Sequence, residues 1–463
     1  MTVRYISTRA VDVGDDGGLG FGDVLLAGLA PDGGLYCPTE IPSLPEIGAD
    51  IDYVDAAVRI FEPFTEGTFS AEELAPMAAA AYAGFRDPAI CPVADLGGGH
   101  HLLDLTLGPT LAFKDVALQM VGQMLEAELN RRGQRVTVIG ATSGDTGSAA
   151  IEALAGAANI DVLILHPRGR VSEVQRRQMT TVTASNIHNV AIEGTFDDCQ
   201  DLVKAAFADA DLRATARLAA VNSINWARVM CQIVYYVTAA RAVRPDGAPV
   251  SFSVPTGNFG NVLSGWYAKR MGLAVDRLVV ASNRNDVLTR FFETGGLETN
   301  KVAPSLSPSM DIQISSNFER LLWEASGRDG QAVAELIAEL RADGRVDVPA
   351  DWYRAITDEF DGDRLDDDGT LAGIAATLAA TERVVDPHTA VGLHAAGIRA
   401  TDVPMISLAT ADPAKFPDAV EAAIGVRPEL PSHLSEILTR PERYEVLPNQ
   451  LDPVAERLRT LAG

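Results

Sequence analysis

A chain of 463 residues is too long for one ordinary domain, and its length predicts two or three. Hydrophobic residues make up 47% of it, enough for a sizeable core, and 38 basic against 63 acidic residues give a formal net charge of −25. Such a surface repels nucleic acid and anionic membranes, so we expect neither as a partner. It also repels an anionic substrate, whose site must therefore supply local positive potential from helix N-termini and a few Lys or Arg side chains.

The four cysteines, Cys37, Cys91, Cys199 and Cys231, are far apart and show no CxxC spacing. This pattern favours buried thiols in a reducing compartment over a zinc site or a disulfide framework, and we expect no metal. The first ten residues lack the apolar stretch of a secretory signal, and no apolar run reaches the roughly 18–20 residues of a membrane span. The sequence therefore predicts a cytoplasmic protein.

Turn-forming residues and amphipathic pieces such as 71–85 fill the first 95 residues, which predicts an extension of helices and short strands. From about residue 100 the chain shows short apolar, β-branched runs, typical of strands buried on both faces. These runs are 135–142, 161–166, 188–192, 249–254, 277–282 and 404–409. The helical patterns between them are 115–132, 148–155, 198–207, 225–243 and 262–271. The alternation predicts an open, mostly parallel sheet covered on both faces, and two such units could fit in residues 100–425. The acidic stretch 361–369 reads as a solvated surface turn.

Two strand–turn–helix junctions are rich in glycine and hydroxyl residues: 140–147 (GATSGDTG) and 255–261 (PTGNFGN). Glycines let the backbone approach a ligand, and the free N–H groups of the first helical turn favour an anion. A tight turn with Ser/Thr capping would show the same residues, and neither loop matches a nucleotide-binding motif. Two such loops in one chain suggest two anions held at once, such as a cofactor phosphate and a substrate carboxylate.

Lys114 ends an apolar run (107–113) at the point where a helix is predicted to begin. Partial desolvation and the positive end of the helix dipole both lower the pKa of such a lysine, which frees its amine for Schiff-base chemistry. The alternative is a surface lysine that extends to solvent and pairs with Asp115.

In combination, these segments resemble threonine synthases. The stretch 112–115 (AFKD) looks like their pyridoxal-phosphate lysine motif. The other segments that carry the resemblance are SGDTGSAA at 143–150, TGNFGN at 256–261, SPSMDIQISSNFER at 307–320, DPHTAVG at 386–392, YISTR at 5–9 and LAPDGGLY at 29–36. The last two look like the longer bacterial and fungal branch. In one departure, the family usually reads Ala-Thr-Ala-His-Pro where residues 409–413 read ATADP, which puts Asp412 near the expected pyridine edge.

The resemblance implies an α/β fold with two open, mostly parallel-sheet domains, similar to the β-subunit of tryptophan synthase, plus an N-terminal extension. The implied domains are an extension (1–95), a large cofactor-binding domain (96–115 and 226–425), a small α/β domain (116–225) and a wrapping tail (426–463). The implied enzyme is a pyridoxal-phosphate-dependent carbon–oxygen lyase. It would convert O-phospho-L-homoserine and water to L-threonine and phosphate by γ-elimination and β-addition, as a monomer or homodimer.

Carried over to this chain, the family's site makes Lys114 the Schiff-base lysine and the general base at the substrate Cα. The cofactor phosphate would be cradled by Gly257, Asn258, Phe259, Gly260 and Asn261. Asp145 would lie near the pyridine hydroxyl, and Thr410 would offer its hydroxyl to the ring nitrogen. The substrate carboxylate would be held by Ser143, Gly144, Thr146 and Gly147.

The substrate phosphate has several candidate ligands, each of which could equally be a surface group: Arg168, Arg170, Ser172, Asn283 and Arg284. A phospho-amino-acid lyase or a dehydratase on the same fold would share Lys114 and the phosphate loop but release a keto acid and ammonia. A binding scaffold without chemistry is disfavoured, because Lys114 and both loops are intact.

Overall fold

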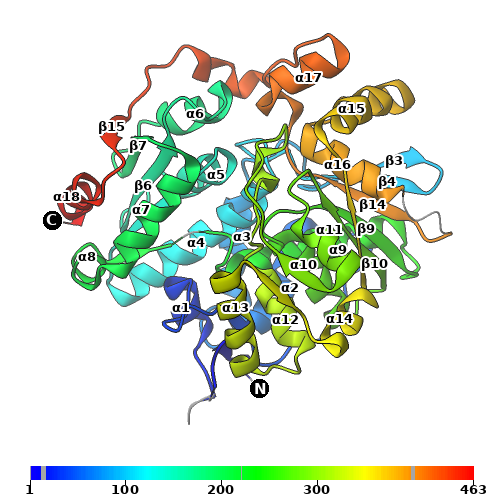
Figure 1. Cartoon of the computed structure of the whole chain (residues 1–463), viewed down its shortest axis with the longest axis horizontal. Coiled ribbons are helices and arrows are strands. Elements are labelled where there is room, and N and C mark those ends of the chain that lie inside the picture. Colours follow the sequence, from blue (N-terminus) through cyan, green and yellow to red (C-terminus); the bar gives the residue numbers. More distant parts are fainter. Residues whose placement is uncertain (1, 12–16, 221, 398–401, 463) are drawn as a thin grey trace.

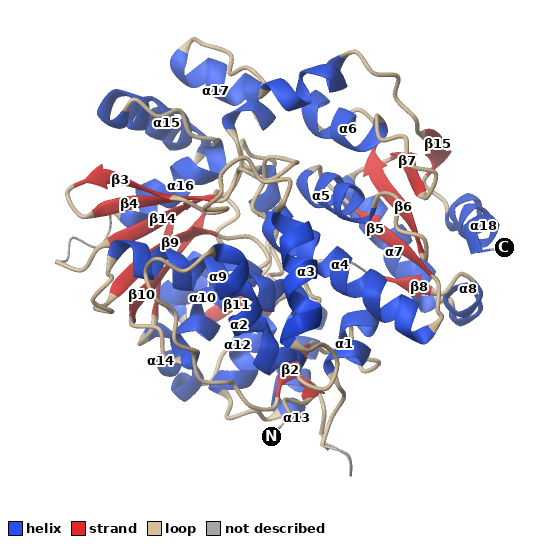
Figure 2. Cartoon of the chain, turned by 180° about the vertical axis from the view of Figure 1, so that it is seen from behind, coloured by secondary structure: helices blue, strands red, loops and turns tan. Residues whose placement is uncertain are grey.

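The computed structural model describes residues 2–11, 17–220, 222–397 and 402–462, and two sheets organise them (Figures 1 and 2). The larger sheet has the strand order β13-β10-β9-β14-β4-β3, and the smaller has the order β15-β7-β6-β5-β8. All neighbours in both sheets run parallel except β3 and β4. The predicted pair of mostly parallel sheets is therefore confirmed.

The larger sheet consists of β3 (Val93–Gly97), β4 (His100–Asp104), β9 (Val250–Pro255), β10 (Val275–Ser282), β13 (Phe360–Arg364) and β14 (Met405–Ala409). Alternate residues of β10 point to opposite faces. Leu278 and Val280 join the main core with α9 (Trp226–Val243) and α10 (Gly260–Met271). Val279 and Ala281 pack with α16 (Pro387–Ala396), and α15 (Asp367–Thr381) lies against α16. Burial on both faces explains the near-continuous apolar runs of the central strands.

The smaller sheet consists of β5 (Val136–Ala141), β6 (Ile160–Pro167), β7 (Ile187–Glu193), β8 (Leu218–Ala219) and β15 (Glu445–Pro448). One face packs on α4 (Lys114–Arg132) and α5 (Asp145–Leu154), with α6 (Glu173–Thr180) next to α5. The other face is covered by α7 (Phe196–Ala208), α8 (Ala210–Thr215) and α18 (Leu451–Ala462). Strand β15 and helix α18 both come from the last forty residues, so the end of the chain completes this sheet and its covering layer.

Helices of the first hundred residues pack on helices that cover both sheets. Helices α2 (Tyr53–Thr65) and α3 (Ala71–Tyr82) pack on each other, α2 contacts α9, and α3 contacts α4. The remaining elements of this region are β1 (Tyr5–Ser7), α1 (Phe21–Ala27) and β2 (Tyr36–Pro38). The other described helices and strands are α11 (Val287–Thr294), β11 (Gly296–Glu298), α12 (Phe318–Ala325), α13 (Gly330–Asp343), β12 (Arg345–Asp347), α14 (Ala350–Thr357) and α17 (Pro417–Ile424).

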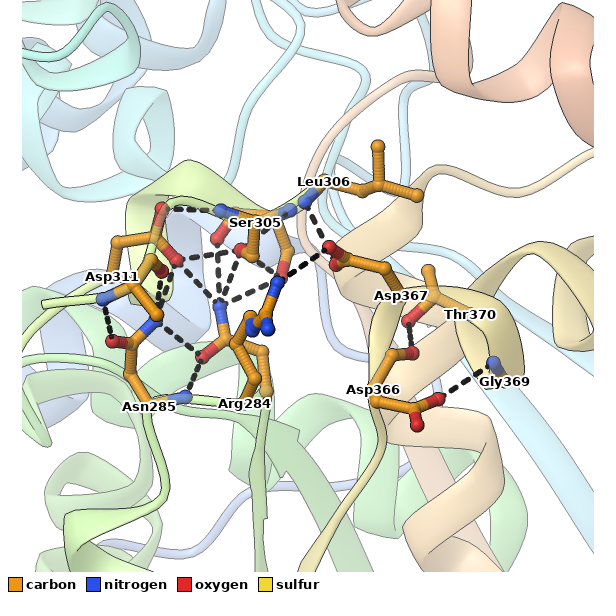
Figure 3. A network of polar contacts seen from close by, with 12 residues as sticks. Arg284, Asn285, Ser305, Leu306, Asp311, Asp366, Asp367, Gly369 and Thr370 are labelled. Atoms are coloured by element: carbon orange, nitrogen blue, oxygen red, sulfur yellow. Dashed lines mark hydrogen bonds and ion pairs between the residues drawn. The ribbon is translucent and has the colours of Figure 1, made fainter.

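The prediction of a surface turn at 361–369 was wrong. Residues 360–364 form β13, an edge strand that pairs with β10, and its first residue, Phe360, is buried. The acidic side chains made the stretch look like a loop, but Asp361 forms an ion pair with Arg277 of β10 at 2.8 Å. Asp366 accepts a hydrogen bond from the Gly369 N–H at 2.8 Å and so caps α15 (Figure 3). An edge strand and a helix cap tolerate charge that a central strand does not.

All four cysteines are buried and unpaired, as predicted. Among the described residues, no helix combines the length and the apolar character that crossing a bilayer requires. Within the same residues, no group of three or more His, Cys, Asp or Glu side chains is placed to hold a metal ion.

Candidate active site

Segments far apart in the sequence meet where strands of both sheets end. The segment ahead of α4 lies against the end of β14. There the Phe113 N–H donates to the carbonyl of Thr410, the residue after β14, at 3.0 Å. The loop after β5 reaches the same place through Asp145, and the 3-10 turn η1 (Pro308–Met310) reaches it through Ser309. Loops at the carboxyl ends of parallel strands commonly build ligand sites in α/β proteins.

Lys114 is the first residue of α4, and only 8% of it is exposed. Its Nζ lies 3.1 Å from Asp145 Oδ2 and 3.5 Å from Ser309 Oγ. Burial lowers the pKa of Lys114 and outweighs the opposing attraction of Asp145. Lys114 is thus neither at the surface nor paired with Asp115, and it has the partial desolvation that a nucleophilic amine requires.

Asp115 turns back toward its own loop. Its carboxylate accepts hydrogen bonds from the Thr110 hydroxyl at 2.6 Å and from the Thr110 N–H at 2.8 Å. The loop passes so close that a Cβ on Gly108 would lie 2.5 Å from the Asp115 Cβ. Burial raises the pKa of Asp115 to about 6. Asp115 therefore fixes the turn that presents Lys114 and leaves the Lys114 amine to another carboxylate.

That carboxylate belongs to Asp145, the first residue of α5, and four donors surround it. Oδ2 accepts from Lys114 at 3.1 Å and from the Ser309 hydroxyl at 3.0 Å. Oδ1 lies 2.8 Å from Lys415 Nζ and 2.8 Å from Gln175 Nε2. Burial alone would raise the pKa of Asp145, but the ammonium groups of Lys114 and Lys415 hold it well below its usual range. Lys415 was not predicted from the sequence, and its side chain is fully buried.

The loop 256–261 opens α10 with neutral groups only. Phe259 precedes the helix in the left-handed region, at φ +63, and its buried ring packs on Phe318 and Phe360 at 5.1 and 5.6 Å between centroids. A bulky residue at positive φ is strained and is held there by its surroundings. Its conformation starts the helix at Gly260, so that the first N–H groups, which lack intrahelical acceptors, end at the loop.

Asn261 adds a side-chain donor to this loop. Its Oδ1 accepts hydrogen bonds from the Tyr235 and Tyr236 hydroxyls at 2.6 and 2.8 Å. These bonds orient the amide, and its Nδ2 is buried without a partner among the described residues. Gly257 allows a close approach, because a Cβ there would lie 2.7 Å from the Ser309 carbonyl oxygen. A buried donor without an acceptor is costly in a finished structure, which indicates that a ligand oxygen belongs here.

Arg228, in the first turn of α9, is a second group without a partner. Only 3% of it is exposed, and its Nε and Nη1 have no hydrogen-bond acceptor among the described residues. Burial lowers the pKa of Arg228 to about 10, and its charge also lowers the pKa of Lys114. Arg228 therefore lies within electrostatic reach of Lys114 and can accept an anionic group. Arg228 was not predicted from the sequence, because it is one cation within an apolar helical pattern.

These residues fit pyridoxal phosphate. A buried amine of lowered pKa suits its aldehyde, and the neutral N–H groups at the start of α10, with the unpaired Asn261 amide, suit its phosphate.

Comparisons with known proteins agree with that fit. The profile "Pyridoxal-phosphate dependent enzyme" matches residues 93–339, "Threonine synthase N terminus" matches 4–82, and "Threonine synthase, C-terminal" matches 389–457. Threonine synthase from Pseudomonas aeruginosa is 49% identical over 98% of this chain and 97% of its own length. This chain belongs to the threonine synthase family. The predicted family, threonine-forming reaction, lyase class and cofactor are thereby confirmed.

Solved structures of the family agree closely with this fold. The structure of pyridoxal-phosphate-bound threonine synthase from Brucella melitensis covers 99% of both chains at 48% identity, with a TM-score of 0.95. Yeast threonine synthase covers 99% of this chain and 98% of its own at 35% identity, with a TM-score of 0.92. The predicted fold class is confirmed.

Asp412, where this chain departs from the family's usual histidine, lines a cavity together with Arg86. Its Oδ1 accepts from the Ala414 N–H at 2.9 Å, and its Oδ2 lies 3.7 Å from an Arg86 nitrogen. Both residues line a cavity of about 200 Å³ to which Lys114 does not contribute. Burial raises the pKa of Asp412. Asp412 caps the 3-10 turn η2 (Pro413–Lys415), and so supports the turn that carries Lys415.

The loop before α5 holds the residues predicted for the substrate carboxylate. The Thr142 hydroxyl accepts hydrogen bonds from the Gly144 and Gly147 N–H groups, both at 2.9 Å, and curls the loop. Gly144 has φ +145, and a Cβ there would lie 2.4 Å from Gln175. The side chains of Ser143 and Thr146 remain half-buried at the surface of the loop.

Four of the five predicted candidates for the substrate phosphate form contacts within the protein. Asn283 donates to Asp311 at 2.8 Å. Asp311 belongs to a polar network with Asn285 and Ser305 that orders the loop ahead of Ser309 (Figure 3). Arg284 pairs with Asp367 at 3.4 Å on the surface, next to that network (Figure 3). Further candidates lie in the segment after β6: Arg168 is exposed and pairs with Glu193, Arg170 is exposed, and Ser172 caps α6.

Proposed function

We propose that this chain converts O-phospho-L-homoserine and water to L-threonine and phosphate, and that Arg228 binds the substrate phosphate. The observation that supports this is that two further buried cations, Lys415 and Arg228, act electrostatically on the buried Lys114 in a protein of net charge −25. A substrate with both a carboxylate and a phosphate requires local positive potential beyond that used by the cofactor. Of these three cations, Arg228 is the one with donors that lack an acceptor among the described residues.

Cofactor binding is assigned to three parts of the site. Lys114 would carry the cofactor as a Schiff base. Its phosphate would lie against Gly257, Asn258, Phe259, Gly260 and Asn261, at the start of α10. Asp145 would lie near the pyridine hydroxyl and Thr410 near the ring nitrogen. When bound, pyridoxal phosphate supplies an electron sink for the negative charge that develops on the substrate carbons.

The chain's own residues then bind the substrate and move protons. The substrate carboxylate would lie at the start of α5, against Ser143, Gly144, Thr146 and Gly147, where free N–H groups favour an anion. Lys114, once released from the cofactor, would remove the Cα proton as a neutral amine. The Arg228 guanidinium would stabilise the charge that collects on the departing phosphate. A second proton would leave Cβ as the phosphate departs from Cγ. Protonation at Cγ, addition of the hydroxyl of water at Cβ and return of a proton to Cα would then complete L-threonine, and the remaining proton of the water would leave with the phosphate.

We further propose the domain limits expected from the sequence: an extension (1–95), a large domain (96–115 and 226–425), a small domain (116–225) and a final segment (426–463). Residue Lys114 then lies at the border between the large and small domains, where α4 begins. We propose a cytoplasmic monomer or homodimer that acts on a small-molecule substrate, without nucleic-acid or membrane partners.

The test is incubation with O-phosphohomoserine while threonine, 2-oxobutyrate and inorganic phosphate are measured together. We expect threonine and phosphate in equal amounts. Release of 2-oxobutyrate and ammonia without threonine would instead identify the phospho-amino-acid lyase or dehydratase that shares Lys114 and the phosphate loop. Reduction with borohydride should fix the cofactor to the peptide that contains Lys114, and a label on any other lysine contradicts the assignment.

A further inference from the structure

One buried carboxylate, that of Asp145, is shared between two lysines. Lys114 Nζ lies 3.1 Å from Oδ2, and Lys415 Nζ lies 2.8 Å from Oδ1. The Lys415 side chain is completely buried, and its ammonium group also donates to the Thr110 carbonyl at 2.7 Å. The cofactor assignment uses Lys114 only, so the second lysine has no role in the reaction as described so far.

The surroundings of Lys415 hold it in place. The Thr110 carbonyl that it contacts also accepts from Gln178 Nε2 at 3.1 Å, and the Thr110 hydroxyl bonds to Asp115. Asp412 caps the short turn on which Lys415 lies. Because these contacts come from three segments, the loop 110–115, α6 and the turn 412–415, the position of Lys415 does not depend on whether Lys114 is free or bonded.

The arrangement has an electrostatic consequence. If Lys114 were the sole counter-ion of a buried aspartate, loss of its proton would leave that carboxylate unpaired, which is costly at this depth. With Lys415 on the other oxygen, the carboxylate keeps a cation when Lys114 is neutral. Two like charges beside one another also favour the neutral form of whichever group can lose its proton.

We propose that Lys415 is a positioning residue that serves as the permanent counter-ion of Asp145 and thereby allows Lys114 to act as a neutral amine. This inference rests on the proposed role of Lys114 as the cofactor lysine and proton carrier. It assigns no contact between Lys415 and the substrate.

The test is Lys415→Met in the cofactor-loaded protein, with Lys204→Met as the matched control, because Lys204 is exposed on α7 and pairs with the equally exposed Asp201. Two quantities are followed against pH: kcat, and the absorption band of the bound cofactor without substrate. We expect Lys415→Met to lower kcat about 10²-fold at neutral pH and to shift the acidic limb of the kcat profile upward by one pH unit or more. The pH at which the absorption band changes should shift in the same direction as the acidic limb of kcat. Lys204→Met should change neither pH dependence.

Asp145→Asn provides the opposite test. Removing the carboxylate leaves two cations facing each other, so the acidic limb should move to lower pH than in the unmodified protein. The double variant Lys415→Met/Asp145→Asn removes one charge of each sign and should return the limb toward its original position. It also covers the case in which Lys415→Met alone loses the cofactor, because the double variant should then regain it.

Several results would overturn the proposal. One is a loss of kcat that is equal at every pH with an unmoved absorption band, which is what a purely structural lysine would give. Others are unchanged kcat in Lys415→Met, or a double variant that behaves like Lys415→Met. Failure of the proposed function looks different, since borohydride would then label a lysine other than Lys114.

Discussion

The loops 142–147 and 256–261 have the same architecture but different chemistry. Each follows a buried parallel strand and opens a helix. The first helix begins with Asp145, whose charge is matched by two buried lysines, whereas the second begins with Gly260 and Asn261, without an ionisable side chain. The backbone of such a loop supplies anion-binding N–H groups in either case. The residue at the first helical positions then decides whether the loop joins the proton chemistry or only holds an anion with neutral donors.

Replacing Lys114 should show the difference in role between the two loops most strongly. Lys114→Ala should lower kcat by about 10²–10⁴, the usual worth of a general base, and loss of covalent attachment should add to this. Cofactor should still bind noncovalently, because the donors at the start of α10 are untouched. The measurements are threonine formation and the cofactor content after gel filtration.

Lys114→Arg is the control for charge. It keeps a cation beside Asp145 but cannot act as an amine base, so it should be as inactive as Lys114→Ala. If Lys114→Arg released phosphate at the unmodified rate, Lys114 would be a structural cation. The loop 142–147 would then have no part in proton transfer.

A charge placed in the neutral loop should remove the cofactor without unfolding the protein. Gly260→Asp puts a carboxylate at the first turn of α10, and the loss of a charge-assisted phosphate contact should weaken cofactor binding about 10- to 100-fold. Gly260→Ala is the matched control, because a Cβ there would lie 3.3 Å from Asn317 Nδ2, a contact that a small shift relieves. Full cofactor occupancy in folded Gly260→Asp would place the phosphate elsewhere.

Arg228 supplies a charge that neither loop contains. Arg228→Met should raise the KM for O-phosphohomoserine about 10- to 100-fold, the worth of one charge-assisted contact, while cofactor content stays constant. The KM of Arg228→Lys should lie between those of the unmodified protein and Arg228→Met, since lysine keeps the charge but lacks the planar guanidinium group. The free energy of unfolding should not fall, because the free guanidinium has unpaired nitrogens and a buried unpaired charge is itself costly. A stability loss without a change in KM would mean that Arg228 has a structural role.

The smallest effect concerns Asp115, a buried carboxylate beside Lys114 that forms no lysine pair. Its folded pKa of about 6 exceeds the usual unfolded value, so between about pH 4 and 6 the folded protein binds more protons than the unfolded one. The free energy of unfolding should therefore fall with rising pH across that window, by up to roughly 3 kcal/mol. Asp115→Asn should flatten this fall in urea titrations, and Asp50→Asn, at an exposed turn, should leave it unchanged. An equal fall in both variants would assign it to other carboxylates.

Most of the fold could be predicted from local pattern. The central strands are buried on both faces, so their apolar runs stand out, and β5, β6, β7, β9, β10 and β14 begin and end within two residues of the predicted runs. The edge strand β13 was not predicted, because its charged residues form ion pairs, such as that of Asp361 with Arg277, instead of facing the core. Charge in a sequence predicts exposure, and it cannot reveal that a partner lies eighty residues away.

The site could be predicted only in part, because only some of its residues have a local signature in the sequence. Lys114 and the two loops have local signatures, namely an apolar run, glycines and a helix start. Lys415 and Arg228 have none, because each is important only through groups brought near by folding, such as Asp145 at a separation of 270 residues for Lys415. Buried cations of this kind become visible only when the remote partners, or their absence, are known.

The pairing of β15 with β7 has a consequence for how the protein is made. Strand β7 ends at Glu193, and its neighbour on one side, residues 445–448, is translated roughly 250 residues later. At about 5–20 residues per second, β7 waits roughly 10–50 s on the ribosome as an uncovered edge, a state in which strands are prone to pair wrongly. The late segment also bonds to α6 through Glu442 and Arg176 at 2.8 Å, and α6 carries the Gln175 that contacts Asp145. Nascent chains stalled before residue 442 should therefore lack one of the supports of the site even when every catalytic residue has been synthesised.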